Sequence, residues 1–328
     1  MTSLAGAGVL AAILLATAAF GPVLLRRSAP ALMRAPRTAV LMVSGGVVAW
    51  AVALVALGPL LAWSASGPAL LAGSAGDVCQ RCLASSNPFG EPFAGLMLPA
   101  AVPLAATGIL GLVIAGGIAV ELHRRWRASI ATAAHLRAVA VTATVRGTRV
   151  LLVDDAAPLA WTLPRRHGGI VVSTGTLDAL TNHELDAVLA HEQAHLSQRH
   201  HLLESIVAGV GRTLGRVPSV RAAISALPHY LEIAADARAQ RVAGTPALAR
   251  ALVVLGSSRV RAQATAGVPG APVLHAAGPQ RIERLVGAAP RRGGTVFAWA
   301  AAVTSVASML WAVAVMIPYG AAVASGCL

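Results

Sequence analysis

The sequence predicts a mostly α-helical, multi-pass membrane protein with four transmembrane helices and one α+β domain inserted between the third and the fourth. Two features of the composition indicate this class. Hydrophobic residues make up 56% of the 328 residues, and the mean hydropathy is +0.69, whereas a soluble domain is about 45–50% apolar. Charged residues are only 12% of the chain and are concentrated in one block. A membrane protein that carries a single soluble domain has this composition.

Four uncharged runs are long enough to cross a bilayer, which takes about 20 helical residues. These runs cover residues 4–25, 39–63, 94–120 and 295–318. We therefore divide the chain into a membrane domain over residues 1–120 with an outer loop at 64–93, a soluble domain over 121–294, and a final helix with a short outer tail over 295–328.

The arginines predict which side of the membrane each segment faces, because cytoplasmic loops carry an excess of basic residues. Arg26 and Arg27 follow the first apolar run, which indicates a retained helix rather than a cleaved signal peptide. Residues 26–37 form a short loop that carries four arginines and no acid, and residues 121–294 hold 21 arginines against 11 acidic residues. We expect a plasma-membrane protein with both termini outside and the soluble domain in the cytoplasm.

The net charge of +13 does not by itself predict nucleic-acid binding, since no recognition motif accompanies it. The lipid bilayer is the expected partner of the apolar runs, and the sequence does not indicate an oligomeric state. Residues 202–228 are apolar in part, but Glu204 and three arginines interrupt them. We expect an amphipathic stretch there that packs in the domain or lies on the membrane surface, rather than a fifth span.

Within the soluble domain, short β-favouring runs at residues 149–153 and 169–174 predict two strands. Thr181, followed three residues later by Glu184, has the form of a capping box, which predicts that a helix starts there. A buried stripe along that helix would consist of Leu185, Val188, Leu189 and Leu196.

The same helix carries an H-E-x-x-H motif formed by His191, Glu192 and His195. Residues four apart lie on one face of a helix, so the two imidazoles can bind one metal ion. Catalytic zinc usually has three protein ligands and one open position. A carboxylate beside that position, here Glu192, is a candidate general base for peptide hydrolysis. Two ordinary core or surface histidines are the alternative, but so specific a match is rare by chance.

A third ligand has to come from another part of the chain. Glu232 and Asp236 are four apart in a helix-like stretch and therefore share a face. Glu232 completes a His-His-Glu ligand set, and Asp236 is placed to accept a hydrogen bond from a ligand imidazole. A solvated acidic helix face is the alternative, but the surrounding residues are Ala, Ile and Leu.

These segments resemble the HtpX-type and BlaR/MecR-type membrane metallopeptidases over roughly residues 150–285. The resemblance rests on Val-Leu-Leu-Val-Asp-Asp at 150–155, Pro-Leu-Ala-Trp at 158–161, the run at 170–177, the motif helix at 184–195 and the E-x-x-x-D at 232–236. Three spans, an inward peptidase domain and a final span are similar to the BlaR/MecR group. The resemblance implies a zincin-like fold and a Zn²⁺ cofactor with three ligands, which are His191, His195 and Glu232, and it implies that Glu192 is the base.

Two departures from the family pattern stand out. BlaR and MecR proteins carry an extracellular penicillin-binding sensor domain after the last span, whereas this chain ends at Leu328. We therefore do not expect direct β-lactam sensing, although the resemblance implies a role in an antibiotic response. HtpX-type relatives have a late His-Pro followed by Arg, and here His275 precedes Arg281 by six residues without that proline. The resemblance implies that His275 or Arg281 stabilises the oxyanion. A loop histidine and a surface arginine are equally compatible, and His229 is a weaker candidate.

The resemblance implies an endopeptidase that cleaves a cytoplasmic protein, with a transcriptional repressor as the substrate of a signalling role. One alternative is an HtpX-like peptidase for the quality control of membrane proteins. Another is a catalytically silent membrane signal transducer, although the intact metal-site residues favour an enzyme. The strand at 170–173 either binds substrate as an added strand or is internal.

The remaining histidines and cysteines carry weaker predictions. For His183, His200 and His201, surface or cap roles are favoured over metal ligation. Cys79 and Cys82 lie in the outer loop, where oxidation is permitted. A local disulfide between them is expected, and a bond from either one to Cys327 is the alternative.

Overall fold

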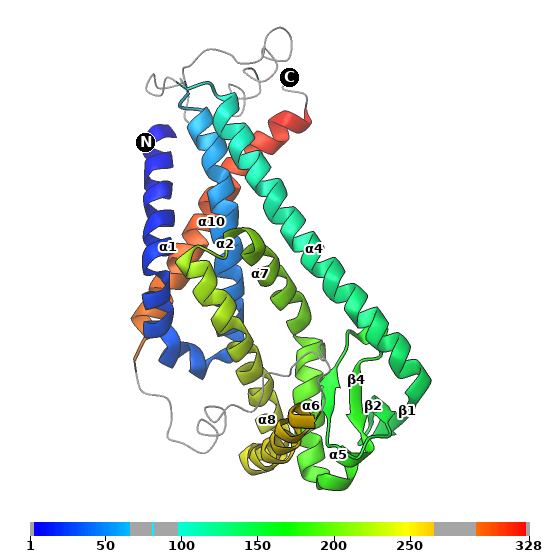
Figure 1. The fold of residues 1–328 in the computed structure, drawn as a ribbon. Coiled ribbons are helices and arrows are strands. Elements are labelled where there is room, and N and C mark those ends of the chain that lie inside the picture. Colours follow the sequence, from blue (N-terminus) through cyan, green and yellow to red (C-terminus); the bar gives the residue numbers. More distant parts are fainter. Residues whose placement is uncertain (1–2, 66–80, 82–97, 266–292, 326–328) are drawn as a thin grey trace.

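The computed structural model describes residues 3–65, 81, 98–265 and 293–325. Within these ranges four helices are long and apolar enough to cross a membrane, and they coincide with the four predicted apolar runs. They are α1 (Ser3–Arg34), α2 (Pro36–Ala62), α4 (Ala101–Val139) and α10 (Thr295–Ala324). Figure 1 shows α1, α2 and α10 at one end of the molecule, and α4 running from there to the sheet at the other end.

The connection between the first two spans differs from the predicted loop at 26–37. Helix α1 continues through the paired arginines to Arg34, and a single residue, Ala35, separates it from α2. The stretch is rich in Ala and Arg, which favour helix. Pro36 sets the boundary, because the residue before a proline is disfavoured in the helical region; Ala35 accordingly has φ −126° and ψ 70°. The predicted loop is therefore almost entirely helical.

A four-stranded sheet forms the far end of the molecule. Its strands are β1 (Ala140–Val145), β2 (Thr148–Val153), β3 (Ala160–Thr162) and β4 (Ile170–Ser173), in the spatial order β1-β2-β4-β3. Strands β2 and β4 are the two predicted ones and pair in parallel. Strands β1 and β3 are additional, and each pairs antiparallel with its neighbour. Strand β4 is internal, so it cannot accept a substrate strand, and β3 lies at an edge.

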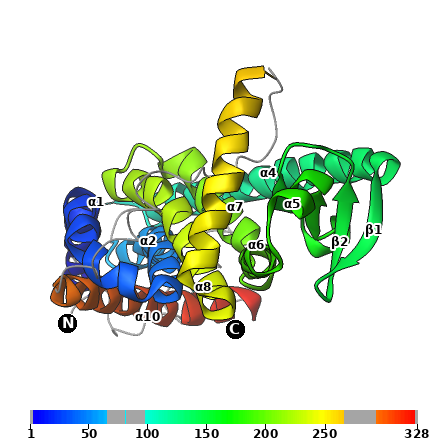
Figure 2. The same cartoon turned by 90° about the horizontal axis from the view of Figure 1, so that it is seen from below.

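The motif helix α6 (Asn182–Ser197) lies between the sheet and α8 (Pro218–Thr265). Its first turn has the predicted capping box, in which the hydroxyl of Thr181 accepts from the Glu184 backbone and the Glu184 carboxylate accepts from the Thr181 backbone. Leu185 and Leu189 pack on the valines and isoleucine of β2 and β4. The opposite side is made of small residues, and Ala187 and Ala190 allow α8 to pack closely. Figure 2 shows α6 and α8 between the membrane helices and the sheet.

The stretch predicted to be amphipathic forms α7 (His200–Leu214) and the start of α8. It packs in a common core with α2 and α4, and neither α7 nor α8 is among the described helices that are long and apolar enough to cross a membrane. Gly209 of α7 and Gly117 of α4 bring the two backbones together, because a Cβ on Gly209 would lie 2.5 Å from the Ile118 Cα. After its contacts with α7, α8 continues as a helix to Gly244, where a φ of 74° breaks the helical geometry.

Candidate metal centre

Two helices bring the predicted metal ligands together. Helix α6 supplies His191 and His195 from adjacent turns, and α8 crosses it with Glu232 facing them. Their ligand atoms all lie within 4.8 Å of one another. Glu192, on the same helix as the histidines, is only 2% exposed, and Asp236 is 5% exposed. Five residues that the sequence singled out are therefore buried in one region.

The donor distances fit a tetrahedral metal ion. The two Nε2 atoms of His191 and His195 are 3.2 Å apart. Each of these Nε2 atoms lies 3.5 Å from a carboxylate oxygen of Glu232. A tetrahedral zinc ion with bonds of about 2.0–2.1 Å separates its ligand atoms by ~3.3 Å. These separations are close to that spacing, with His191 nearest to Oε2 and His195 nearest to Oε1 of Glu232.

Asp236 orients the first histidine. The Nδ1 atom of His191 lies 3.0 Å from the Asp236 Oδ1, an ion-pair contact that places Nε2 on the side of Glu232. Burial alone lowers the pKa of His191, but the hydrogen bonds with Asp236 and Glu232 outweigh it and raise the pKa to about 10. Two buried carboxylates therefore create a negative field that a proton or a metal cation can satisfy, and a divalent ion fits the donor set.

His200 orients the second histidine, which corrects the predicted surface or cap role. It is 2% exposed, and its Nδ1 lies 2.9 Å from the Nδ1 of His195. Its Nε2 is within 3.4 Å of the Gln198 side-chain oxygen and donates to it. The Nδ1 of His200 then accepts the Nδ1 proton of His195, and this leaves the His195 Nε2 lone pair directed at the cluster. Burial lowers the pKa of His200 to about 4, which keeps the ring neutral.

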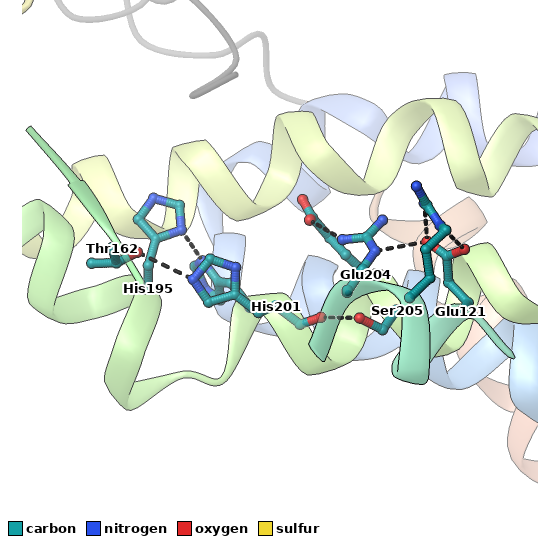
Figure 3. A network of polar contacts seen from close by, with 9 residues as sticks. Glu121, Thr162, His195, His201, Glu204 and Ser205 are labelled. Carbon is teal, nitrogen blue, oxygen red and sulfur yellow. Dashed lines mark hydrogen bonds and ion pairs between the residues drawn. The ribbon is translucent and has the colours of Figure 1, made fainter. Parts of the chain in front are cut away.

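The turn between α6 and α7 makes this contact possible. Arg199 adopts a left-handed backbone conformation with φ 53°, and α7 starts at the next residue. The reversal folds His200 back over His195, while His201 points the other way, to within 3.2 Å of the Thr162 hydroxyl on β3. Figure 3 shows His195, Thr162 and His201 together at this turn. No sequence motif reveals such a reversal, and this is why the buried role of His200 was missed.

A chain of ion pairs follows α7 toward the membrane helices. Arg125 of α4 contacts Glu121 on its own helix and Glu204 of α7, at 2.8 and 3.0 Å. Figure 3 shows Glu204, Ser205 and Glu121 along this direction. These contacts hold α7, which starts at His200, against α4.

Other predicted site residues are less informative. His183 is exposed, as expected, and His229 is exposed on α8. His275 and Arg281 lie outside the described residues, as do Cys79, Cys82 and Cys327. Their proposed roles stay predictions.

Comparisons with known proteins agree with this geometry. Residues 128–288 match peptidase family M48. The protease HtpX homolog of Acidiphilium cryptum (strain JF-5) is 32% identical, over 32% of this chain and 48% of the relative. The homolog of Ralstonia pickettii (strain 12J) is 36% identical over 25% of this chain and 26% of the relative. The homolog of Burkholderia thailandensis (strain ATCC 700388 / DSM 13276 / CCUG 48851 / CIP 106301 / E264) is 32% identical over 29% of this chain and 30% of the relative.

The chain thus spans between about a quarter and a half of the length of these curated relatives. No solved structure matches significantly. Neither finding singles out the BlaR/MecR group, so that part of the resemblance stays a prediction. Four apolar helices, the match of residues 128–288 to peptidase family M48 and the similarity to HtpX homologs together support an HtpX-type membrane metallopeptidase.

Proposed function

We propose that this protein is a zinc-dependent endopeptidase, anchored in the plasma membrane, that cleaves proteins at the cytoplasmic face. The observation that carries the proposal is the buried cluster of His191, His195 and Glu232, whose donor atoms all lie within 4.8 Å of one another, with Glu192 buried on the same helix. The match to peptidase family M48 supports hydrolysis of peptide bonds over other zinc chemistry.

Each residue of the site has a separate task in this reaction. Zinc, when bound to the His-His-Glu set, supplies a Lewis acid that polarises the scissile carbonyl. Glu192 accepts a proton from the attacking water and delivers it to the leaving amine. Asp236 and His200 hold the two imidazoles with Nε2 toward the cluster. The burial of His191, Glu192 and Glu232 limits the access of bulk water to these groups.

The base assignment is tested with the purified full-length chain in detergent and an unfolded protein such as casein. Glu192→Gln keeps the three metal ligands and is expected to retain zinc while cleavage falls about 10²–10⁴-fold, the usual contribution of a general base. Asp178→Asn is the matched control, because Asp178 is exposed on the short helix α5 (Thr174–Ala179). Unchanged cleavage by Glu192→Gln would refute the assignment. If the wild-type protein binds zinc but cleaves no substrate, the result would favour the silent transducer.

The cytoplasmic placement of the domain rests on the arginine bias around the four apolar helices. A topology reporter fused near residue 160, at the sheet, is expected to read as cytoplasmic. An extracytoplasmic reading would reject both the topology and a cytoplasmic substrate.

Two biological roles fit the same chemistry. In the first, the enzyme is a signalling protease that cleaves a transcriptional repressor, as the BlaR/MecR resemblance implies. In the second, it is a quality-control peptidase for membrane proteins, and the similarity to HtpX homologs favours this role. Proteomes of cells with the wild-type enzyme and with Glu192→Gln separate the two. A single accumulating repressor supports signalling, whereas many accumulating membrane-protein fragments support quality control.

A further inference from the structure

A cleft of about 830 Å³ opens beside the candidate metal centre, with His195 in its wall. One side is α4 between Leu122 and Thr132, and the other is the turn between α6 and α7. The end of edge strand β3 and the segment after it, from Thr162 to Arg166, form the third wall. A peptide bound along this edge would lie in this cleft, next to the side chain of His195.

The walls of the cleft carry positive charge, most of which has no acidic partner in the described part of the chain. Four arginines line it, and no Asp or Glu does. Arg125 is paired with Glu121 and Glu204. In the described part of the chain, no ion pair involves the other three, Arg165, Arg166 and Arg199, which are all exposed. Three arginines are therefore available to a ligand.

The positive surface continues on the far side of the segment after β3. A second cavity of about 780 Å³ shares Arg165 and Arg166 with the cleft and adds Arg137 and Arg149, again with no acidic residue in its lining. The charge also acts on a neutral neighbour, since burial and then Arg166 and Arg137 lower the pKa of His167. An extended ligand could thus contact arginines over more than one residue position.

We propose that this cleft selects protein substrates with Asp or Glu side chains close to the scissile bond. Carboxylates are the natural partners of unpaired guanidinium groups, and here they would lie in the same cleft as a metal-ligand imidazole. The inference rests on the proposed peptidase function and adds the substrate class to it. An anionic lipid headgroup has the same charge, but the position of His195 in the wall favours a peptide, because a segment to be cleaved must enter there.

The selectivity is tested with the full-length chain in neutral nanodiscs and a mixed peptide library, in which cut sites are identified by mass spectrometry. Asp and Glu are expected to be enriched within about three residues of cuts that depend on Glu192. The triple variant Arg165→Glu/Arg166→Glu/Arg199→Glu should lower cleavage of an acidic peptide about 10-fold or more, since each exposed pair contributes up to about five-fold, and should raise cleavage of its lysine counterpart. The control is Arg238→Glu/Arg241→Glu, two exposed arginines on α8 that do not line the cleft.

A binding measurement separates the failure of this inference from the failure of the proposed function. Fluorescein-labelled peptides with two Glu, two Gln or two Lys are titrated against the Glu192→Gln protein, in which no turnover is needed. Tighter binding of the Glu peptide, lost in the triple variant and weakened by salt, supports the cleft even if no cleavage is found. Cleavage with no acidic preference overturns the inference and leaves the peptidase standing. If the triple variant changes only the activation of the enzyme by anionic lipid, the cleft binds lipid headgroups. That result would also overturn the inference.

Discussion

The contact between Gly209 and α4 gives a prediction whose size follows from the structure. A Cβ on Gly209 would lie 2.5 Å from the Ile118 Cα and 3.0 Å from its backbone nitrogen, whereas carbon atoms prefer about 3.5–4.0 Å. Gly209→Ala therefore has to move α7 and α4 apart by about 1 Å. Such overpacking costs about 1–3 kcal/mol, and the better helix propensity of alanine returns up to about 1 kcal/mol. We expect a net loss of about 1 kcal/mol in the free energy of unfolding.

Gly116→Ala is the matched control, because a Cβ at Gly116 meets no atom within 4 Å. It keeps the gain in helix propensity without the clash, so the two variants should differ by about 2 kcal/mol. Thermal unfolding in detergent, followed by the fluorescence of the six tryptophans, should show a lower midpoint for Gly209→Ala by several degrees. Zinc affinity should fall as well, because α7 begins at His200. A midpoint at or above that of Gly116→Ala would refute the close helix contact.

Three further outcomes follow from the site and its helix. Asp236→Asn and His200→Ala should each weaken zinc binding about 10–100-fold in chelator competition, the usual effect of losing a group that orients a ligand, while the exposed His183→Ala should not. Thr181→Ala should cost about 1 kcal/mol of stability through loss of the cap, measured by denaturant unfolding. The hydrogen bond from the Thr181 backbone holds the pKa of Glu184 below its usual value despite burial, so the advantage of wild type over Glu184→Gln should be complete at neutral pH and disappear as the pH falls through that lowered pKa.

Sequence reasoning succeeded where the signal is local. Uncharged runs identified the four long apolar helices, and the cap at Thr181 located the start of the motif helix. The side chains of His191 and His195 converge because a helix period fixes their spacing. Glu232 lies with them although it is 37 residues farther along the chain, and the pattern of acids on an apolar helix predicted this contact without specifying its geometry.

Two strands were missed because pairing, rather than composition, stabilises them. Strand β1 consists of Ala, Val and Thr that are exposed or half-buried, so no fully buried face marks it. Strand β3 has three residues and depends on its hydrogen bonds with β4. The β1–β2 turn places both Arg146 and Gly147 at positive φ, and arginine is not the residue that normally indicates such a hairpin turn.

The position of α7 and the role of His200 depend on contacts between distant segments. Glu204 looked like an interruption of an apolar stretch, but its partner is Arg125, 79 residues earlier. Adjacent histidines do point in different directions on a helix, as expected. Here, however, both side chains contact other parts of the domain: His200 contacts His195, and His201 contacts Thr162.

Under the proposed topology, the continuity of α4 limits the distance between the end of the third apolar run and the cleft. Glu121 is the first charged residue after the third apolar run, and the wall of the cleft on this helix extends to Thr132. At about 1.5 Å per residue these positions lie within ~18 Å of the end of the run. An extended polypeptide covers that distance in about six residues. Under the proposed topology and peptidase function, a protein anchored in the same membrane would need only a short unfolded tail to reach the cleft, so tails too short to form a folded domain would already be within reach.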